Sequence, residues 1–506
     1  MKTKHVRFVI PVLATGIILS GCSLTDKTSI SNDSTPPVIT GAQSSNPVNN
    51  GVRISWATDE PATSAVRYGT GADYGSSVEI PALVTDHAVY LSGLQADTEY
   101  HYMVASSDSS GNRSESEDMV FTTTNAPAYG SAYYSQWENG LPSDTGFFPL
   151  AVWLQSPGNA ANYAAIGINT YVGLWQGPTD SQLAALHSSG MNVICAQNDT
   201  GLTHQYNAMI RAWMHNDEPD NAQWDAGTGS YTYCIAPAVL VDLYRGWKAA
   251  DPTRPVLLNF GQGVANIGWY GRWYLDNIGG KDYSGDNYSL YYTEASEAAD
   301  ILSYDIYPVT DSDSNISGKL EYVASGVRNL ILWSGGTKPV WNCIETTHIS
   351  NAATRPTPAQ IRSEVWMSII AGSMGIIYFV HEWEPSFRED GIFNYSDAVA
   401  AVADINAMIA GLAPVLNTQS ITGSVEVSSG DPDTPVDMMV KSRDGNTYIF
   451  SAAMRNTPVT AEFTVSGISD AAVEVLGESR SIPLSEGSFQ DAFDGYGVHL
   501  YRIATP

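Results

Sequence analysis

The chain has 506 residues, with 24 Lys and Arg against 53 Asp and Glu, which gives a formal net charge of −29 at pH 7. This acidic balance argues against nucleic acid as a partner, because phosphate binding needs a basic face. The length allows roughly three domains of about 150 residues each. A hydrophobic share of 43% is ordinary for a globular protein.

The N-terminal segment predicts export. Three basic residues within the first seven positions precede an apolar run over 8–19, which is too short to anchor stably across a bilayer. The run ends in Leu19-Ser-Gly-Cys22, which resembles a bacterial lipobox and implies lipid modification of Cys22. The alternative is an ordinary signal peptide with an incidental cysteine. An Asp after Cys22 would favour the inner membrane, and Ser23 stands there instead, so we expect a lipoprotein of the outer membrane or cell surface.

The next segments predict a tether and a first β-domain. Residues 23–36 are mostly Ser, Thr, Asn and Asp, as in a flexible tether. Residues 37–124 contain short alternating strands, and their Leu94 to Tyr100 arrangement resembles the tyrosine corner of an immunoglobulin-like sandwich. With Trp56 on an early strand, this segment resembles a fibronectin type III domain. Such a domain would serve as a spacer or bind glycan.

The central segment predicts a (β/α)8 TIM barrel. Residues 125–144 are expected to form a linker, and strand and helix signals alternate over 145–412. Eight β/α units in this length match the barrel, whereas a doubly wound open sheet lacks its glycine fingerprint after the first strand. The predicted strands cover 149–153, 170–174, 192–196, 210–214, 255–259, 301–305, 339–344 and 375–380.

The last segment, 413–506, returns to short strands, with Asp444-Gly445 as a hairpin signal. We predict a C-terminal β-sandwich there. The fold class is therefore multidomain, with the barrel flanked by an N-terminal immunoglobulin-like sandwich and a C-terminal sandwich.

Two glutamates stand at the ends of two predicted strands. The strand over 210–214 runs into a carboxylate-rich turn that holds Asp217 and Glu218, and Pro219 must end the strand because it cannot donate to a ladder. The strand over 339–344 ends at Glu345. Side chains at the carboxyl ends of barrel strands line the active site. Two such carboxyl groups are what cleavage of a glycosidic bond requires.

This arrangement resembles the retaining glycoside hydrolases of clan A, which carry the acid/base on strand four, commonly in Asn-Glu-Pro, and the nucleophile on strand seven. The resemblance implies that Glu218 is the acid/base and Glu345 the nucleophile, cleaving a β-linked polysaccharide or oligosaccharide with retention. The chain departs from the pattern at Asp217, where the family has Asn. An ionised Asp217 can only accept a hydrogen bond from the sugar 2-hydroxyl, which puts recognition at that position in doubt.

The same resemblance assigns further substrate-binding residues. It implies that Trp383 forms the subsite floor after strand eight and that Tyr307 hydrogen-bonds the nucleophile. Glu382 competes for the role of nucleophile, and it is displaced if Trp383 holds the floor position. Five more side chains near predicted strand ends are expected to line the cleft: Trp153, Trp175, Asn198, His215 and Asn259.

We expect no metal and no cofactor, because the sequence has no zinc spacing among its His and Cys, no phosphate loop and no nucleotide fingerprint. Cys195 and Cys234 either form a disulfide or stay thiols, and Cys343 is expected to pack as a small apolar residue. We expect a monomer. The alternatives to a retaining enzyme are a non-catalytic glycan-binding surface lipoprotein and an inverting hydrolase.

Overall fold

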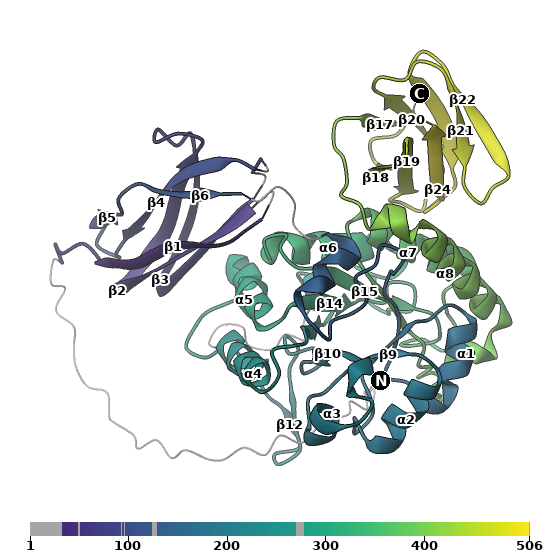
Figure 1. Ribbon diagram of the computed structural model, residues 1–506, viewed down its shortest axis with the longest axis horizontal. Coiled ribbons are helices and arrows are strands. Elements are labelled where there is room, and N and C mark those ends of the chain that lie inside the picture. Colours follow the sequence, from purple (N-terminus) through teal and green to yellow (C-terminus); the bar gives the residue numbers. More distant parts are fainter. Residues whose placement is uncertain are drawn as a thin grey trace. The chain divides into compact units, whose positions relative to one another are not determined.

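The computed structural model describes residues 33–48, 51–92, 94–95, 97–123, 129–269 and 278–504. Cys22 and the rest of the predicted signal segment lie outside the described residues. The chain forms two compact units, one before and one after residue 127. Figure 1 shows the strands of the first unit in purple and blue, and the barrel and C-terminal strands in teal to yellow.

The N-terminal unit is an antiparallel β-domain built on the long strand β2, whose bulged pairings let it join several partners. Trp56 lies buried in its core and donates from Nε1 to Ser106 Oγ at 2.9 Å. The Tyr100 hydroxyl accepts from the Gln95 backbone N–H at 3.0 Å, which is the contact expected of a tyrosine corner. The strands are β1 (Ile39–Val48), β2 (Gly51–Gly69), β3 (Ser76–Ser92), β4 (Glu99–Ser107), β5 (Arg113–Glu115) and β6 (Met119–Thr122).

The central fold is a closed barrel of eight parallel strands, in the order β10-β13-β14-β15-β16-β7-β8-β9. Each strand overlaps one of the eight predicted from the sequence, so the TIM barrel is confirmed and the open-sheet alternative is wrong. The barrel strands are β7 (Leu150–Trp153), β8 (Thr170–Val172), β9 (Asn192–Cys195), β10 (Ile210–Met214), β13 (Val256–Phe260), β14 (Ile301–Asp305), β15 (Val340–Glu345) and β16 (Ile376–Phe379).

Helices cover the outside of the barrel (Figure 1). Two of them begin with a capping box, at Thr179 and Thr357, where the Thr side chain and the third helical residue exchange hydrogen bonds. The last helix is apolar and long enough to cross a membrane by length and composition, but it packs beside its neighbour in the helical layer. The helices are α1 (Ala160–Ala165), α2 (Asp180–Ser188), α3 (Asp199–Thr203), α4 (Pro237–Ala250), α5 (Tyr288–Ala295), α6 (Tyr322–Trp333), α7 (Pro358–Ile370) and α8 (Ser396–Leu416).

Alternation along the strands sorts side chains between two cores. On β15, Trp341 and Cys343 face the barrel interior, while Val340 and Ile344 pack against the outer helices. Tyr134 and Leu141 also belong to the interior cluster, and Trp341 Nε1 donates to the Tyr134 hydroxyl at 3.0 Å. Residues 129–144 were expected to be a linker. Tyr134 and Leu141 of this segment instead pack with the side chains of the barrel interior.

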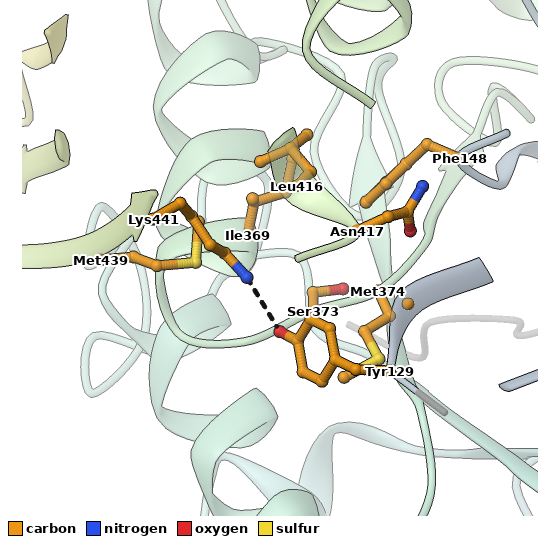
Figure 2. A pocket seen from close by; sticks show the side chains of 10 residues that line it. Tyr129, Phe148, Ile369, Ser373, Met374, Leu416, Asn417, Met439 and Lys441 are labelled. Carbon is orange, nitrogen blue, oxygen red and sulfur yellow. Dashed lines mark hydrogen bonds between the residues drawn. The ribbon is translucent and has the colours of Figure 1, made fainter. Parts of the chain in front are cut away.

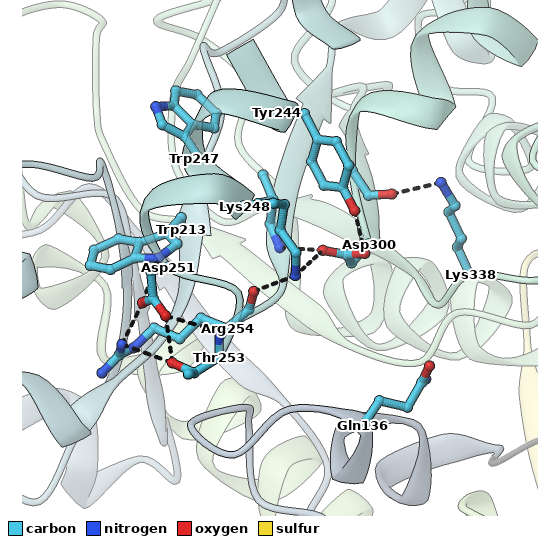
Figure 3. A network of polar contacts seen from close by, with 12 residues as sticks. Gln136, Trp213, Tyr244, Trp247, Lys248, Asp251, Thr253, Arg254, Asp300 and Lys338 are labelled. Carbon is cyan, nitrogen blue, oxygen red and sulfur yellow. Dashed lines mark hydrogen bonds and ion pairs between the residues drawn. The ribbon is translucent and has the colours of Figure 1, made fainter. Parts of the chain in front are cut away.

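A polar network ties together the N-terminal ends of β10, β13 and β14 (Figure 3). Asp251 accepts from Trp213 Nε1 at 3.0 Å and pairs with Arg254 at 2.5 Å. Arg254 also donates to the Ile210 carbonyl at 2.7 Å. Buried charges are tolerated when they are paired and hydrogen-bonded in this way. The network therefore fixes the barrel at the end opposite to the carboxyl ends of the strands.

The C-terminal segment is a sandwich of two antiparallel sheets with an apolar core between them, as predicted. Its three-stranded sheet is β17 (Val425–Ser429), β20 (Val459–Val465) and β23 (Ser488–Phe493). Its five-stranded sheet is β18 (Val436–Arg443), β19 (Asn446–Ala453), β24 (Val498–Ala504), β21 (Ala471–Val475) and β22 (Arg480–Leu484).

A buried lysine marks the junction between this sandwich and the barrel (Figure 2). Lys441 has no exposed surface, and its Nζ lies 3.2 Å from the Tyr129 hydroxyl and also donates to the Thr418 carbonyl. Burial lowers the pKa of Lys441 to about 7. The junction is therefore a packed interface, in which Trp366 of α7 also stacks on Phe450 of β19.

Candidate active site

The turn after β10 holds Glu218 in an unusual backbone conformation. Its φ of +44° lies in the left-handed region, which is uncommon for a residue with a side chain. Two backbone hydrogen bonds hold it there: the Glu218 N–H donates to the Asn259 carbonyl at 2.9 Å, and the Glu218 carbonyl accepts from Asn221 N–H at 3.1 Å. Such strain persists only where the surroundings enforce it, and it is concentrated at functional sites.

The next carboxylate in this turn, Asp220, is structural. It is buried, and it accepts from the Gly261 N–H at 2.8 Å and from the Tyr292 hydroxyl at 3.0 Å. Asn221 adds a second anchor by accepting from Trp269 Nε1 at 2.8 Å. Asp217 is exposed and Glu218 half-buried, so these two acids are the ones presented to solvent.

Asn259 organises the floor beneath the turn. It is buried at the carboxyl end of β13, and its Nδ2 donates to Asp217 Oδ1 at 2.9 Å. Its Oδ1 accepts from Ser303 Oγ at 2.8 Å, and the Cys343 thiol lies 3.8 Å from the same oxygen. Asn259 therefore positions Asp217 and is not itself open to solvent.

A third acid, Asp305, joins this group from the end of β14. It pairs in register with Cys343 on β15, so the two side chains start from the same level of the barrel. The pKa of Cys343 is raised well above its ordinary value by burial and by the charges of Asp305, Asp217 and Glu218. The pKa of Tyr307 is also raised, by loss of solvent first and then by Asp305, Cys343, Glu218 and Asp217. Asp217, Glu218 and Asp305 thus form one acidic cluster around Tyr307 and Cys343.

Glu345 lies outside this acidic cluster. Its side chain has no exposed surface. Its carboxylate accepts from the backbone N–H groups of Val309 and Thr310, the latter at 3.0 Å, and from Thr310 Oγ1 at 2.7 Å. A nucleophile must reach the anomeric carbon of a bound sugar, so this placement does not fit the role expected from the sequence. The physical reason is local: two loop amides and a hydroxyl draw the carboxylate away from the mouth of the barrel.

The partner of Glu345 is a second buried acid, Glu364 on α7. Burial raises the pKa of Glu345 to about 7, and hydrogen bonds from Thr310 and Val309 oppose the rise. The pKa of Glu364 is raised further, first by burial and then by the charge of Glu345. Two carboxyl groups this deeply buried cannot both ionise readily, so we expect Glu364 to keep its proton when Glu345 is charged.

Glu382, the alternative nucleophile, is also occupied. It is buried, and its carboxylate accepts from the Tyr395 hydroxyl and from Asn394 Nδ2, the latter at 3.1 Å. Next to it, Trp383 is half-buried and its ring lies 4.7 Å from the exposed ring of Phe387. The expected position of Trp383 beyond β16 is therefore compatible with an aromatic platform at the mouth.

A row of rings connects this platform to the acidic cluster. The Tyr307 ring lies 5.0 Å from Phe379, and Phe379 lies 5.0 Å from His381. The His381 ring lies 6.2 Å from Trp383. Burial lowers the pKa of His381 to about 4, so its imidazole is neutral at pH 7. The mouth thus combines acids on one side with aromatic rings on the other.

Two of the remaining predicted binding residues are structural. His215 is buried behind β10, with Nε2 3.1 Å from the Leu240 carbonyl and its ring 4.6 Å from Trp247. Alternation from Ala212 inside to Trp213 outside makes His215 face the helices. Asn198 caps α3 by accepting from the Gly201 N–H at 2.8 Å. The expectation that His215 lines the cleft is wrong, whereas Asn198 is exposed and its place in the cleft stays a prediction.

The two tryptophans expected in the cleft differ. Trp153 ends β7 and is buried among the side chains that fill the barrel interior. Trp175 follows β8 and is exposed, as a sugar-stacking ring must be. Only Trp175 presents a face to solvent.

The sequence reasoning missed Asp305 and Glu364. Asp305 ends the predicted sixth strand, so the rule that strand-end side chains line the site would have found it. Glu364 gives no such signal, because a glutamate in an amphipathic helix is ordinarily solvated.

The three described cysteines, Cys195, Cys234 and Cys343, are buried free thiols, so the disulfide alternative for the first two is wrong. Among the described residues, Asp33, Glu60 and Asp108 of the N-terminal unit lie close enough together to hold a metal ion. That group is not in the barrel, and exposed acids often cluster without an ion.

No protein-family model matches the chain, and no curated protein does. Solved structures resemble it weakly. A protein assigned as an alpha-galactosidase from Bacteroides fragilis is 10% identical, with a TM-score of 0.40 over 92% of this chain and 98% of that chain. A GH30 endoxylanase from Clostridium papyrosolvens is 13% identical, with a TM-score of 0.37 over 71% and 96%. An alpha-amylase from Geobacillus thermoleovorans is 9% identical, with a TM-score of 0.36 over 71% and 98%. Similarity this low carries no argument about function.

Proposed function

We propose that the protein is a glycoside hydrolase that cleaves a polysaccharide or oligosaccharide with Glu218 as acid/base and Asp305 as the second carboxylate. The observation that carries the proposal is geometric: Asn259 binds Asp217 and lies 3.8 Å from the Cys343 thiol, and Asp305 is in register with Cys343. The raised pKa values of Tyr307 and Cys343 agree with a cluster of Asp217, Glu218 and Asp305 around them. The exposed Trp175 and the Trp383–Phe387 platform supply faces on which sugar rings stack.

In the reaction we propose, an Asp305 oxygen attacks the anomeric carbon while the bond to the leaving oxygen breaks. Glu218 gives its proton to that oxygen and then, as a carboxylate, takes a proton from water. The water oxygen attacks the anomeric carbon and releases Asp305. Asp217, held by Asn259, accepts a hydrogen bond from a sugar hydroxyl. Cys343 stays a neutral thiol because of its raised pKa.

Retention and a β-linked substrate remain predictions from the sequence. Retention requires the two carboxyl groups to act about 5–5.5 Å apart, while inversion requires about 6.5–9.5 Å. ¹H NMR of the first-formed anomer distinguishes the two outcomes. Cleavage of α-linked but not β-linked substrates would contradict the predicted linkage.

The function is tested by incubating the mature protein with a panel of polysaccharides and comparing Glu218→Gln with the parent on whichever polymer is cleaved. Loss of Glu218 is expected to lower kcat by about 10²–10⁴-fold, the usual contribution of a general acid/base. Glu382→Gln is the matched control, because that carboxylate is tied to Tyr395 and Asn394 at the same mouth. Equal losses in both variants would contradict the assignment.

A second candidate is a non-catalytic glycan-binding protein, which the burial of Glu345 favours. A parent that cleaves none of the panel but is retarded in gels containing a polysaccharide would support this alternative.

We also propose that a lipid on Cys22 anchors the protein at the outer membrane or cell surface, on the evidence of the lipobox resemblance. Incorporation of labelled palmitate, and its loss together with membrane association in Cys22→Ser, tests this. Unchanged membrane association in the variant would contradict it.

A further inference from the structure

An aromatic hairpin rises from the loop that carries Glu218. It consists of β11 (Trp224–Asp225) and β12 (Ser230–Tyr231), and it projects from the barrel in Figure 1. Trp224 is 41% exposed, Tyr231 39% and Tyr233 54%. Three large rings at the surface in ten residues are costly in water and contribute little to any core, so a binding role explains them better than packing.

The base of the hairpin is hydrogen-bonded to the turn of Glu218. Gln223 donates from Nε2 to the Glu218 carbonyl at 3.1 Å and to the Asn221 carbonyl at 2.8 Å. On the other side of the hairpin's base, after β12, the Ile235 N–H donates to the Pro219 carbonyl at 2.8 Å. The base of the hairpin is therefore fixed to the turn that carries Glu218.

The rings of the hairpin brace each other. Trp224 and Tyr231 pair in register across the two strands, and their centroids lie 5.2 Å apart in an edge-to-face arrangement at 73°. Such a pair keeps each ring in one orientation without burying it. A braced, exposed ring is suited to stacking on the flat apolar face of a sugar.

The second aromatic platform lies on the other side of the mouth. In the closed sheet, β10 and β16 are separated by four steps in either direction, so they are opposite each other. The hairpin follows β10, and the Trp383–Phe387 platform follows β16. The acids of the acidic cluster come from the ends of β10 and β14, and β14 lies between β10 and β16 in the barrel. The middle of a ligand that contacts both platforms would therefore lie beside the carboxylates.

We propose that the hairpin rings Trp224 and Tyr231 hold the distal part of an extended, uncharged polysaccharide, which spans the mouth to Trp383 and Phe387 and is cut within the chain. This inference rests on the proposed function for the cutting but not for the binding. An uncharged chain fits because the protein has a net charge of −29 and its mouth carries three acids, so an acidic glycan would be repelled.

The variants Trp224→Ala and Tyr231→Ala test the platform in two assays. One is retardation in gels that contain xylan, mixed-linkage β-glucan, galactomannan or soluble starch. The other is kcat/KM on the polymer that the parent cleaves, compared with an aryl glycoside of the same sugar. Each variant is expected to weaken polymer retardation about tenfold, and to lower kcat/KM on polymer about tenfold more than on the aryl glycoside.

Two further variants serve as controls. Trp224→Phe keeps a ring and is expected to recover most of the polymer binding. Leu332→Ala removes an apolar side chain that is 67% exposed on α6 and is expected to match the parent in both assays. Early products on polymer are expected to be oligosaccharides of mixed length, as cleavage within a chain produces.

The outcomes separate this inference from the proposed function. Equal losses on polymer and aryl glycoside would overturn the platform, because the hairpin would then only support the Glu218 turn. Unchanged retardation would overturn it too, and release of only mono- or disaccharide would overturn cleavage within the chain. Retardation that Trp224→Ala abolishes, in a parent that cleaves nothing, would uphold the platform while the hydrolase fails. A parent with neither retardation nor cleavage would overturn both.

Discussion

Two strand ends of this barrel carry a glutamate, and the structure treats them in opposite ways. Glu218 follows β10 on a strained turn and stays half-buried among other acids and Tyr307. Glu345 ends β15, has no exposed surface and is held by Val309 and Thr310. We propose that the first acts on a ligand, whereas the second is tied to the loop after β14.

The difference teaches that a strand end fixes the level of a side chain along the barrel but not its direction. At β10, Pro219 stops the ladder and Asp220 clamps the turn to Gly261, which leaves Glu218 directed elsewhere. At β15, two loop amides compete for the carboxylate and bind it. Hydrogen bonds from neighbouring loops therefore decide which acid reaches the mouth.

The largest expected effect comes from removing Asp305, to which we give the nucleophile role that the sequence predicted for Glu345. Asp305→Ala is expected to lower kcat by about 10³-fold or more, because it removes the proposed nucleophile. Glu345→Gln is expected to lower kcat by less than about tenfold, since the carboxylate is buried and tied to Val309 and Thr310. Rates are compared at equal folded fraction. Recovery of activity by azide in Glu345→Ala, and not in Asp305→Ala, would restore Glu345 as the nucleophile.

The buried pair predicts a pH-dependent stability. The pKa of Glu345 rises to about 7 in the folded protein from an ordinary value of 4.5, so the folded state holds protons that the unfolded chain has released. The contribution of this group to the free energy of unfolding is therefore fully present below about pH 4.5. It falls as the pH rises toward 7, by up to about 1.4 kcal/mol per pH unit for each proton. Urea unfolding of the parent and Glu364→Gln at pH 5, 6, 7 and 8 measures the difference. Identical slopes in the two proteins would show that Glu364 does not affect the titration of Glu345.

Asn259→Ala sharpens the comparison within the acidic cluster. It removes the amide that donates to Asp217, while Glu218 keeps its backbone contact with the residue 259 carbonyl. We expect kcat/KM to fall by about tenfold, the value of one hydrogen bond to a charged group. Scanning calorimetry of the variant measures its loss of stability, so that kcat/KM is compared at a temperature where both proteins are folded. A loss of kcat/KM as large as that in Glu218→Gln would mean that the activity depends on Asn259 as much as on Glu218.

The smallest expected effect is at Asn198, whose side chain caps α3. Asn198→Ala is expected to lower the free energy of unfolding by about 1 kcal/mol and to leave kcat/KM unaltered. Asn198→Asp keeps the cap acceptor and serves as the control. A selective rise in KM in the alanine variant would return Asn198 to the substrate-binding residues.

Much of the architecture follows from local sequence. Each of the eight barrel strands is a short apolar run ended by a turn signal, and such a run must be buried wherever it lies. The corner at Tyr100 and the hairpin at Asp444-Gly445 were readable for the same reason, because their partners lie within a few residues. Asp305 was readable too, since it ends a strand that the sequence places correctly.

The sequence alone located the eight barrel strands to within about two residues at either end, and so placed Glu218 and Glu345 at one end of a barrel. Only the tertiary structure decided which of them face the mouth. Glu345 is drawn aside by Thr310, 35 residues earlier in the chain, and shares its burial with Glu364 on a helix. The physical reason is that strand formation depends on adjacent residues, whereas the direction of a polar side chain depends on donors that folding brings from elsewhere.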